Sequence, residues 1–157
     1  NVSEMRQIKV QIDKIVERIL IFILGIMVIN VLWQVFSRFF TMNPSSFTDE
    51  LSRYLMVWLG ILGASYVAGK KEHVAIDYFT KKLNKNNRII IDCFVNFSII
   101  SFSLVVMLIG GGYLVYITIK LEQHSPSLKI PLGLVYSIMP ICGILIIFYK
   151  LCQIKKY

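Results

Sequence analysis

The sequence predicts an all-α integral membrane protein with four transmembrane helices. Of the 157 residues, 56% are hydrophobic, and the mean hydropathy of +0.66 is high for a soluble domain. Four runs contain no charged residue, at 19–37, 54–69, 93–119 and 130–149, and a helix needs about 20 apolar residues to cross a bilayer. Because no segment outside these runs is longer than 23 residues, we expect residues 1–157 to form a single membrane domain without a soluble domain.

The distribution of basic residues predicts the orientation of the chain. Thirteen of the 17 lysines and arginines lie in segments that four spans place on the same side as the N-terminus, and the other four are Arg38, Arg53, Lys120 and Lys129. Cytoplasmic segments of membrane proteins are enriched in lysine and arginine. We therefore expect both termini in the cytoplasm, and the net charge of +8 to face anionic phospholipid rather than nucleic acid.

The first span is expected at about 15–38. Asn30 and Gln34 lie four residues apart within it, so they share one helical face. Hydrogen bonding to a neighbouring helix is favoured over a polar substrate path, because no ionisable residue joins the pair. Residues 1–18 carry apolar positions at helical spacing, which is typical of either an extension of this span or a short interfacial helix.

The second span, expected at about 50–69, begins with a charged turn. Asp49, Glu50 and Arg53 are spaced so that all three can meet on one helical face. An ion pair at the start of the helix is favoured over a contact with another protein. Tyr54 and Trp58 follow, and Trp58 is interpreted as a packing or interfacial aromatic rather than a substrate contact.

A stripe of small residues follows on the same span. Gly60, Ala64 and Ala68 recur every four residues, with Gly63 beside them. Small residues allow membrane helices to approach closely. The stripe is consistent with a contact inside this chain or with another chain, and the internal contact is favoured.

Residues 74–85 are predicted to form an amphipathic helix on the cytoplasmic membrane surface, because lysines flank an apolar stripe there. An ordinary charged loop is the alternative. Glu72 and His73 close the charged turn that precedes it. His73 and Asp77 are expected to cap this helix rather than to bind a metal or carry a proton.

The third span is expected at about 89–119 and the fourth at about 130–150. The triplet 110–112 is all glycine, which suggests a helix break, a tight packing site or a lipid-filled notch; tight packing or local flexibility is favoured. Pro131 suits a first helical turn. Pro140 lies inside the fourth span and predicts a kink nearby.

No residue pattern indicates an enzyme, a cofactor site or a metal site. The predicted topology places His73 and His124 on opposite faces of the membrane, and no metal-binding spacing occurs. No charged residue lies in the middle third of any predicted span, although intramembrane charge usually marks a solute pathway. The chain is therefore expected to support another membrane protein. A self-sufficient small transporter or channel is the alternative, and a membrane enzyme or haem anchor is a third class.

The stretch TDELSRYLMVWLGILGASYVAGKKEHVAIDYF resembles the signature region of the small membrane subunit, the DctQ-like subunit, of tripartite ATP-independent periplasmic (TRAP) transporters. The residues that carry this likeness are Asp49, Glu50, Arg53, Tyr54, Trp58, Gly63, Glu72, His73 and Asp77. The start of the fourth span is also similar to the family, through Pro126, Leu128, Ile130, Pro131, Tyr136 and Pro140. One departure is Asp49, where the family often has Glu.

The resemblance implies a bacterial inner-membrane protein that pairs with a large membrane subunit of the elevator type. That partner is expected to carry the substrate and sodium sites. A periplasmic binding protein would deliver an organic acid, such as sialic acid or a C4-dicarboxylate. The small subunit would act as a non-catalytic scaffold without a cofactor of its own. Its outer face at Asp49, Glu50 and residues 120–129 would help to dock the binding protein.

Overall fold

A computed structural model describes residues 2–40, 46–70 and 85–154 of the chain. These residues form helices and a loop at 121–131, which holds one isolated bridge between His124 and Pro131. The elements are α1 (Val2–Phe40), α2 (Ser46–Lys70), α4 (Lys85–Phe102), the π-helix η1 (Ser103–Gly110), α5 (Gly111–Lys120), α6 (Leu132–Tyr136) and α7 (Ile138–Ile154). The predicted all-α class is confirmed.

Four of these helical segments are long and apolar enough to cross a membrane: Gln7–Phe40, Ser46–Lys70, Cys93–Lys120 and Leu132–Cys152. The prediction of four spans is thereby confirmed. The 39 residues of α1 form one unbroken helix, about 58 Å long at 1.5 Å per residue. Residues 2–18 are therefore an extension of the first span, and the separate interfacial helix considered for them is wrong.

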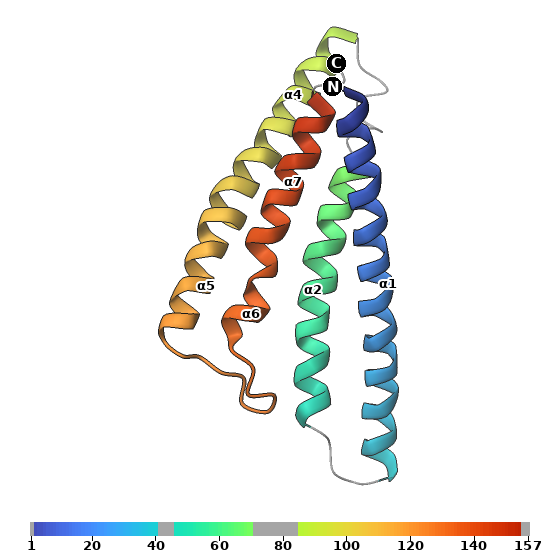
Figure 1. Ribbon diagram of the computed structural model, residues 1–157, viewed down its shortest axis with the longest axis vertical. Coiled ribbons are helices and arrows are strands. Elements are labelled where there is room, and N and C mark those ends of the chain that lie inside the picture. The colour runs from blue at the N-terminus through green and yellow to red at the C-terminus, as the bar shows by residue number, and fades with distance from the viewer. Residues whose placement is uncertain (1, 41–45, 71–84, 155–157) are drawn as a thin grey trace.

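The four spans lie side by side in a row rather than around a closed core. Figure 1 shows α1 beside α2, α2 beside α7, and α7 beside the third span of α4, η1 and α5, in agreement with the contacts between these elements. The first turns of α1 and the last turns of α7 lie at one end of the row, and the loop 121–131 lies at the other end. The cytoplasmic location of the first of these ends stays a prediction.

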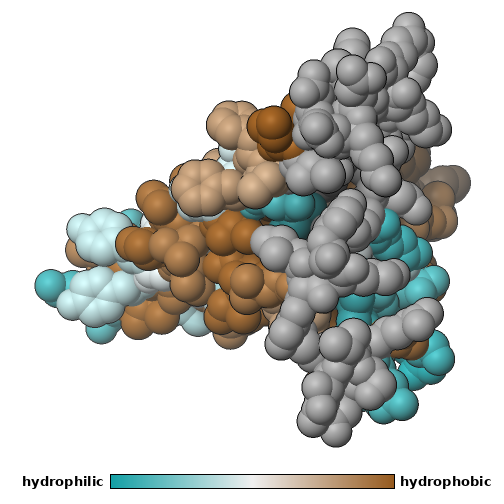
Figure 2. Space-filling model, turned by 90° about the horizontal axis from the view of Figure 1, so that it is seen from above, coloured by the Kyte–Doolittle hydropathy of each residue, from teal (hydrophilic) through white to brown (hydrophobic). Residues whose placement is uncertain are grey.

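The buried core is small and lies along the middle of the row. Its residues are Val16 and Ile23 of α1, Leu62 of α2, and Ile138 and Cys142 of α7. Large apolar side chains cover the outer faces instead, and Figure 2 shows broad hydrophobic areas on the surface seen from above. An exposed apolar surface of this extent is expected where lipid or another membrane protein replaces water.

Glycines bring α7 and the third span into close contact. A Cβ built on Gly111 would lie 2.8 Å from the Cβ of Met139, and one built on Gly143 would lie 3.0 Å from the Cβ of Met107. Gly112, by contrast, has no other heavy atom within 4 Å of its Cβ position. Tight packing, favoured for the glycine triplet, is confirmed at Gly111. The chain stays helical through the triplet, in which Gly110 ends η1 and Gly111 begins α5.

The fourth span is interrupted where Pro140 predicts a kink. α6 ends at Tyr136 and α7 begins at Ile138, so Pro140 lies in the first turn of α7. The first N–H groups of a helix have no acceptor inside it, so proline, which lacks an N–H, is tolerated at that position. Pro131 is expected in the first turn of the helix. It lies just before that turn, as the N-cap of α6, and its backbone is extended.

The small-residue stripe of α2 faces two different environments. Ala68 is buried, whereas Gly60 and Ala64 are exposed, and the Cβ position of Gly60 has no other heavy atom within 4 Å. The expected internal contact is therefore wrong for Gly60 and Ala64. The reason is that α1 and α7 pack on the adjacent faces of α2, where Leu62 and Ser65 are buried.

The predicted surface helix at 74–85 falls almost wholly outside the described residues. Glu72, His73 and Asp77 also lie outside them. Their predicted roles stay predictions.

Candidate functional site

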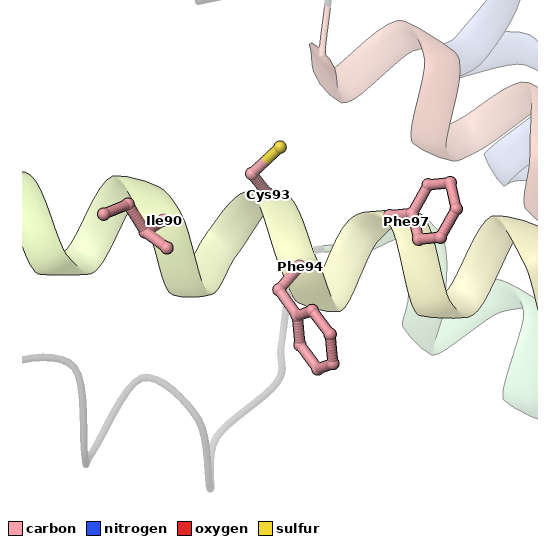
Figure 3. Close-up of a pocket in the computed structure, with 4 residues that line it drawn as sticks. All are labelled: Ile90, Cys93, Phe94 and Phe97. Carbon is pink, nitrogen blue, oxygen red and sulfur yellow. The ribbon is translucent and has the colours of Figure 1, made fainter.

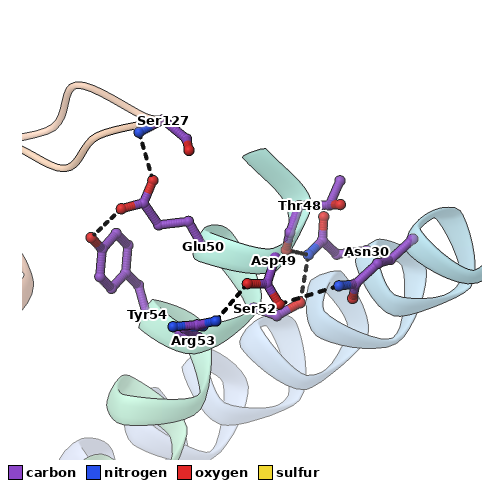
Figure 4. A network of polar contacts seen from close by, with 9 residues as sticks. Asn30, Thr48, Asp49, Glu50, Ser52, Arg53, Tyr54 and Ser127 are labelled. Carbon is purple, nitrogen blue, oxygen red and sulfur yellow. Dashed lines mark hydrogen bonds and ion pairs between the residues drawn. The ribbon is translucent and has the colours of Figure 1, made fainter. Parts of the chain in front are cut away.

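Polar side chains gather where α2 begins, and they join α1, α2 and the loop between α5 and α6. We call this group the polar network, and Figure 4 shows most of it. Its members are Asn30, Gln34, Thr48, Asp49, Glu50, Ser52, Arg53, Tyr54, Ser125, Ser127 and Leu128. Most of the motif residues predicted near the start of α2 belong to this network.

The α1 part of the network holds the first two spans together. The Asn30 side-chain amide donates to the carbonyl oxygen of Thr48 and to Oγ of Ser52, both at 2.7 Å. One turn later, Nε2 of Gln34 donates to Oδ1 of Asp49 at 3.3 Å. The interpretation of Asn30 and Gln34 as interhelical hydrogen-bonding residues is confirmed. Their amides are therefore not arranged along a polar path.

Arg53 pairs with Asp49 rather than with both acidic residues. Its guanidinium lies 2.7 Å from Oδ2 of Asp49, and the exposed fractions of the two side chains are 75% and 48%. An exposed ion pair of this kind contributes little to stability, because water screens both charges. The guanidinium therefore remains accessible on the outer surface of the row.

Glu50 turns away from Arg53 and binds the loop. Its Oε2 accepts hydrogen bonds from the backbone N–H groups of Ser127 at 2.9 Å and Leu128 at 3.2 Å. Its other oxygen accepts from the Tyr54 hydroxyl at 2.8 Å. The expected ion pair between Glu50 and Arg53 is therefore wrong. The carboxylate instead ties α2 to a segment about 77 residues away along the chain.

The loop that Glu50 holds has a defined backbone of its own. Ser125 is buried, and its Oγ accepts a second hydrogen bond from the N–H of Leu128 at 3.2 Å. Glu122 and Lys129 adopt positive φ values of 48° and 54°, which non-glycine residues seldom do. Pro126 is exposed at the tip between them. Glu50 and Ser125 thus anchor a loop in which two non-glycine residues have left-handed backbone conformations.

Comparison with known proteins decides the family. Residues 27–156 match the family described as "Tripartite ATP-independent periplasmic transporters, DctQ component". The chain belongs to this DctQ family. A Haemophilus influenzae protein provisionally named as a TRAP transporter small permease protein is 30% identical over 142 residues, which cover 90% of this chain and 86% of that protein.

Two further relatives of this DctQ component are named for sialic acid. The sialic acid TRAP transporter small permease protein SiaQ of Vibrio cholerae is 23% identical over 155 residues, covering 96% of this chain and 86% of that protein. The sialic acid TRAP transporter permease protein SiaT of Haemophilus influenzae is 36% identical over 62 residues, or 40% of this chain and 10% of that protein. The chain is thus a TRAP transporter small permease subunit and a multi-pass protein of the bacterial inner membrane.

Trp58 and Gly63, two of the expected motif residues, lie deeper along α2. The indole N–H of Trp58 donates to the carbonyl oxygen of Val135 at 3.0 Å, which joins α2 to α6 close to the interruption of the fourth span. The Cβ position of Gly63 lies 4.0 Å from Leu20 of α1, an ordinary contact. The sequence indicates that Trp58 packs, but not which carbonyl it binds, because that carbonyl is 77 residues away.

At the other end of the row, the structure adds a contact that sequence patterns do not indicate. Nζ of Lys9 donates to the carbonyl oxygen of Gly69 at 2.7 Å and lies 5.7 Å from the ring centre of Tyr149. Gly69 leaves room for that ring, since a Cβ there would lie 2.8 Å from it. Lys9, Gly69 and Tyr149 thus join α1, α2 and α7.

Metal-binding side chains do not cluster in the part of this small permease subunit that the structure describes. Among residues 2–40, 46–70 and 85–154, no cluster of three His, Cys, Asp or Glu side chains could hold a metal ion. An apolar pocket on α4 is lined by Ile90, Cys93, Phe94 and Phe97 (Figure 3). No lining side chain carries a charge that would bind an organic acid.

Replacing Trp58 by Phe is expected to destabilise the subunit by about 1–2 kcal/mol, because the Val135 carbonyl loses its donor inside the membrane. The measurement is the thermal unfolding midpoint of the purified protein in detergent. Trp33→Phe is the matched control, since Trp33 is 57% exposed and stacks on Phe36 at the surface of α1. Equal shifts for the two variants would contradict a role for the hydrogen bond.

Proposed function

We propose that this chain is the non-catalytic scaffold subunit of a sodium-coupled TRAP transporter for an organic acid. In this role, it braces a large elevator-type membrane subunit that carries the sodium and substrate sites. The supporting observation is that polar side chains in the spans of this chain form hydrogen bonds between its own helices. In the described spans, Asn30, Gln34 and Trp58 bind neighbouring helices, whereas a solute pathway would need such groups along its lining.

The relatives support the pairing with a large subunit. The match to SiaT covers only 10% of that permease, so a segment similar to part of this chain lies within a protein about ten times longer than the match. Segments that share one polypeptide are held close to each other in space. A separate small subunit would instead contact the large permease subunit by binding to it through the outer faces of the row of helices.

Sialic acid is the substrate class that the relatives favour, because SiaQ and SiaT are both named for it. A C4-dicarboxylate is the other candidate. Either acid would be delivered by a periplasmic binding protein, and the loop anchored by Glu50 with the exposed Arg53 is the proposed docking surface. This arrangement requires cytoplasmic termini and places the predicted surface helix at 74–85 against the inner lipid leaflet.

Co-purification tests the proposed partnership. When this chain carries an affinity tag and is expressed with the large TRAP membrane subunit of the same organism, the two are expected to elute together as one complex in mild detergent. An unrelated four-span membrane protein with the same tag is the control. Elution of the tagged chain alone, with the large subunit intact in the membrane fraction, would contradict the proposal.

A further inference from the structure

Two cations on the inner half of α1 have no partner among the residues that the structure describes. Within the described residues, Lys14 and Arg18 form neither an ion pair nor a hydrogen bond, and both side chains are exposed. Lys9, by contrast, bonds to α2. The acidic residue next to Arg18 is also engaged elsewhere, because Glu17 accepts from the Tyr66 hydroxyl at 3.4 Å.

An apolar surface continues the face on which these cations lie. Counting from Lys14, steps of four, four, three and four residues lead to Arg18, Phe22, Gly25 and Ile29, and such steps keep residues on one side of a helix. Phe22 is 67% and Ile29 is 69% exposed. Gly25 has no other heavy atom within 4 Å of its Cβ position, so a flexible chain can lie against the backbone between the two larger side chains.

The positions of these residues along α1 match one leaflet of a bilayer. The uncharged run begins directly after Arg18, which places Arg18 at the edge of the hydrocarbon core and Lys14 about 6 Å farther out. Ile29 lies about 16 Å inward from Arg18, close to half of a core that is about 30 Å thick. Figure 2 also shows hydrophilic residues gathered on the side where α1 lies.

We propose that this face binds one anionic phospholipid. The lipid phosphate lies between the Lys14 ammonium and the Arg18 guanidinium, and one acyl chain lies along Phe22, Gly25 and Ile29. A phosphate supplies negative charge at the depth where the two unpaired cations lie, and the acyl chain covers the apolar residues that continue from them. The inference requires only that α1 spans the membrane and does not depend on the scaffold role.

Native mass spectrometry of the purified chain tests the proposal with dioleoyl phosphatidylglycerol and dioleoyl phosphatidylcholine as probes. The wild type is expected to retain the first phosphatidylglycerol in preference to phosphatidylcholine. Each cation near an anionic lipid contributes a factor of about five, so the double variant Lys14→Gln/Arg18→Gln is expected to bind phosphatidylglycerol about 25-fold more weakly. The control variant Arg38→Gln/Lys129→Gln removes two exposed cations at the opposite end and is expected to bind like the wild type.

Three results would overturn the proposal: no preference for phosphatidylglycerol in the wild type, equal weakening in both double variants, or displacement of the lipid by millimolar inorganic phosphate. A second measurement uses the assembled transporter in cells. A photoreactive benzoylphenylalanine in place of Phe22 is expected to cross-link to lipid. Cross-linking to the large membrane subunit instead would show that a protein covers this face, and the proposal would be wrong.

Discussion

Gly111→Ala is expected to destabilise the four-helix unit by about 1–3 kcal/mol, the usual cost of overpacking a tight contact. The added methyl group would lie 2.8 Å from the Cβ of Met139 and 3.3 Å from Cδ of Pro140. Neither atom can swing away, because both are attached closely to the backbone of α7. The helices must therefore separate, and the thermal unfolding midpoint in detergent should fall.

The adjacent glycine supplies the control for this experiment. Gly112→Ala adds the same methyl group to the same helix, but no other heavy atom lies within 4 Å of that position. Alanine also favours a helix over glycine by up to about 1 kcal/mol, so this variant should be as stable as the wild type or more stable. If both variants lowered the midpoint equally, close packing at Gly111 would not be the cause.

Glu50→Ala is expected to release the loop at 121–131 without unfolding the helices. The loss of Oε2 leaves the N–H groups of Ser127 and Leu128 without their carboxylate acceptor, and bonds to a charged acceptor are the stronger ones. Hydrogen exchange followed by mass spectrometry should show exchange in this loop faster by about tenfold. The spans should exchange as in the wild type.

Asp49→Ala is the matched control for Glu50→Ala. It removes a carboxylate from the same helical turn, but Asp49 contacts Arg53 and Gln34 rather than the loop. Loop exchange should therefore remain unchanged in this variant. Faster exchange in both variants would assign the effect to net charge, and no change in Glu50→Ala would show that the carboxylate does not hold the loop.

The features that could be predicted from the sequence are those set by local patterns. Uncharged runs of suitable length predict four spans, because bilayer thickness is the same for every helix. Four-residue spacing predicts that Asn30 and Gln34 share a face and that Arg53 can reach Asp49, since these depend only on helix geometry. A proline inside an apolar run predicts an interruption, and the structure has it at Ser137.

The features that could not be predicted depend on which helices become neighbours. Spacing allows Glu50 to meet Arg53, but its backbone partners belong to a distant loop that the fold brings close. The regular spacing of Gly60, Ala64 and Ala68 predicts one small-residue face, but not that the packing of α1 and α7 leaves Gly60 and Ala64 exposed. The sequence gives no means of telling the three consecutive glycines apart. Of the three, only Gly111 has a Cβ position that would contact α7.

The most direct test of the scaffold account is sodium-driven uptake of labelled sialic acid into liposomes, supplied with the periplasmic binding protein. Liposomes that contain this chain alone should show no uptake above empty liposomes. Uptake should appear when the large membrane subunit is included with this chain, and it should be absent with the large subunit alone. Uptake by this chain without the large subunit would contradict the account.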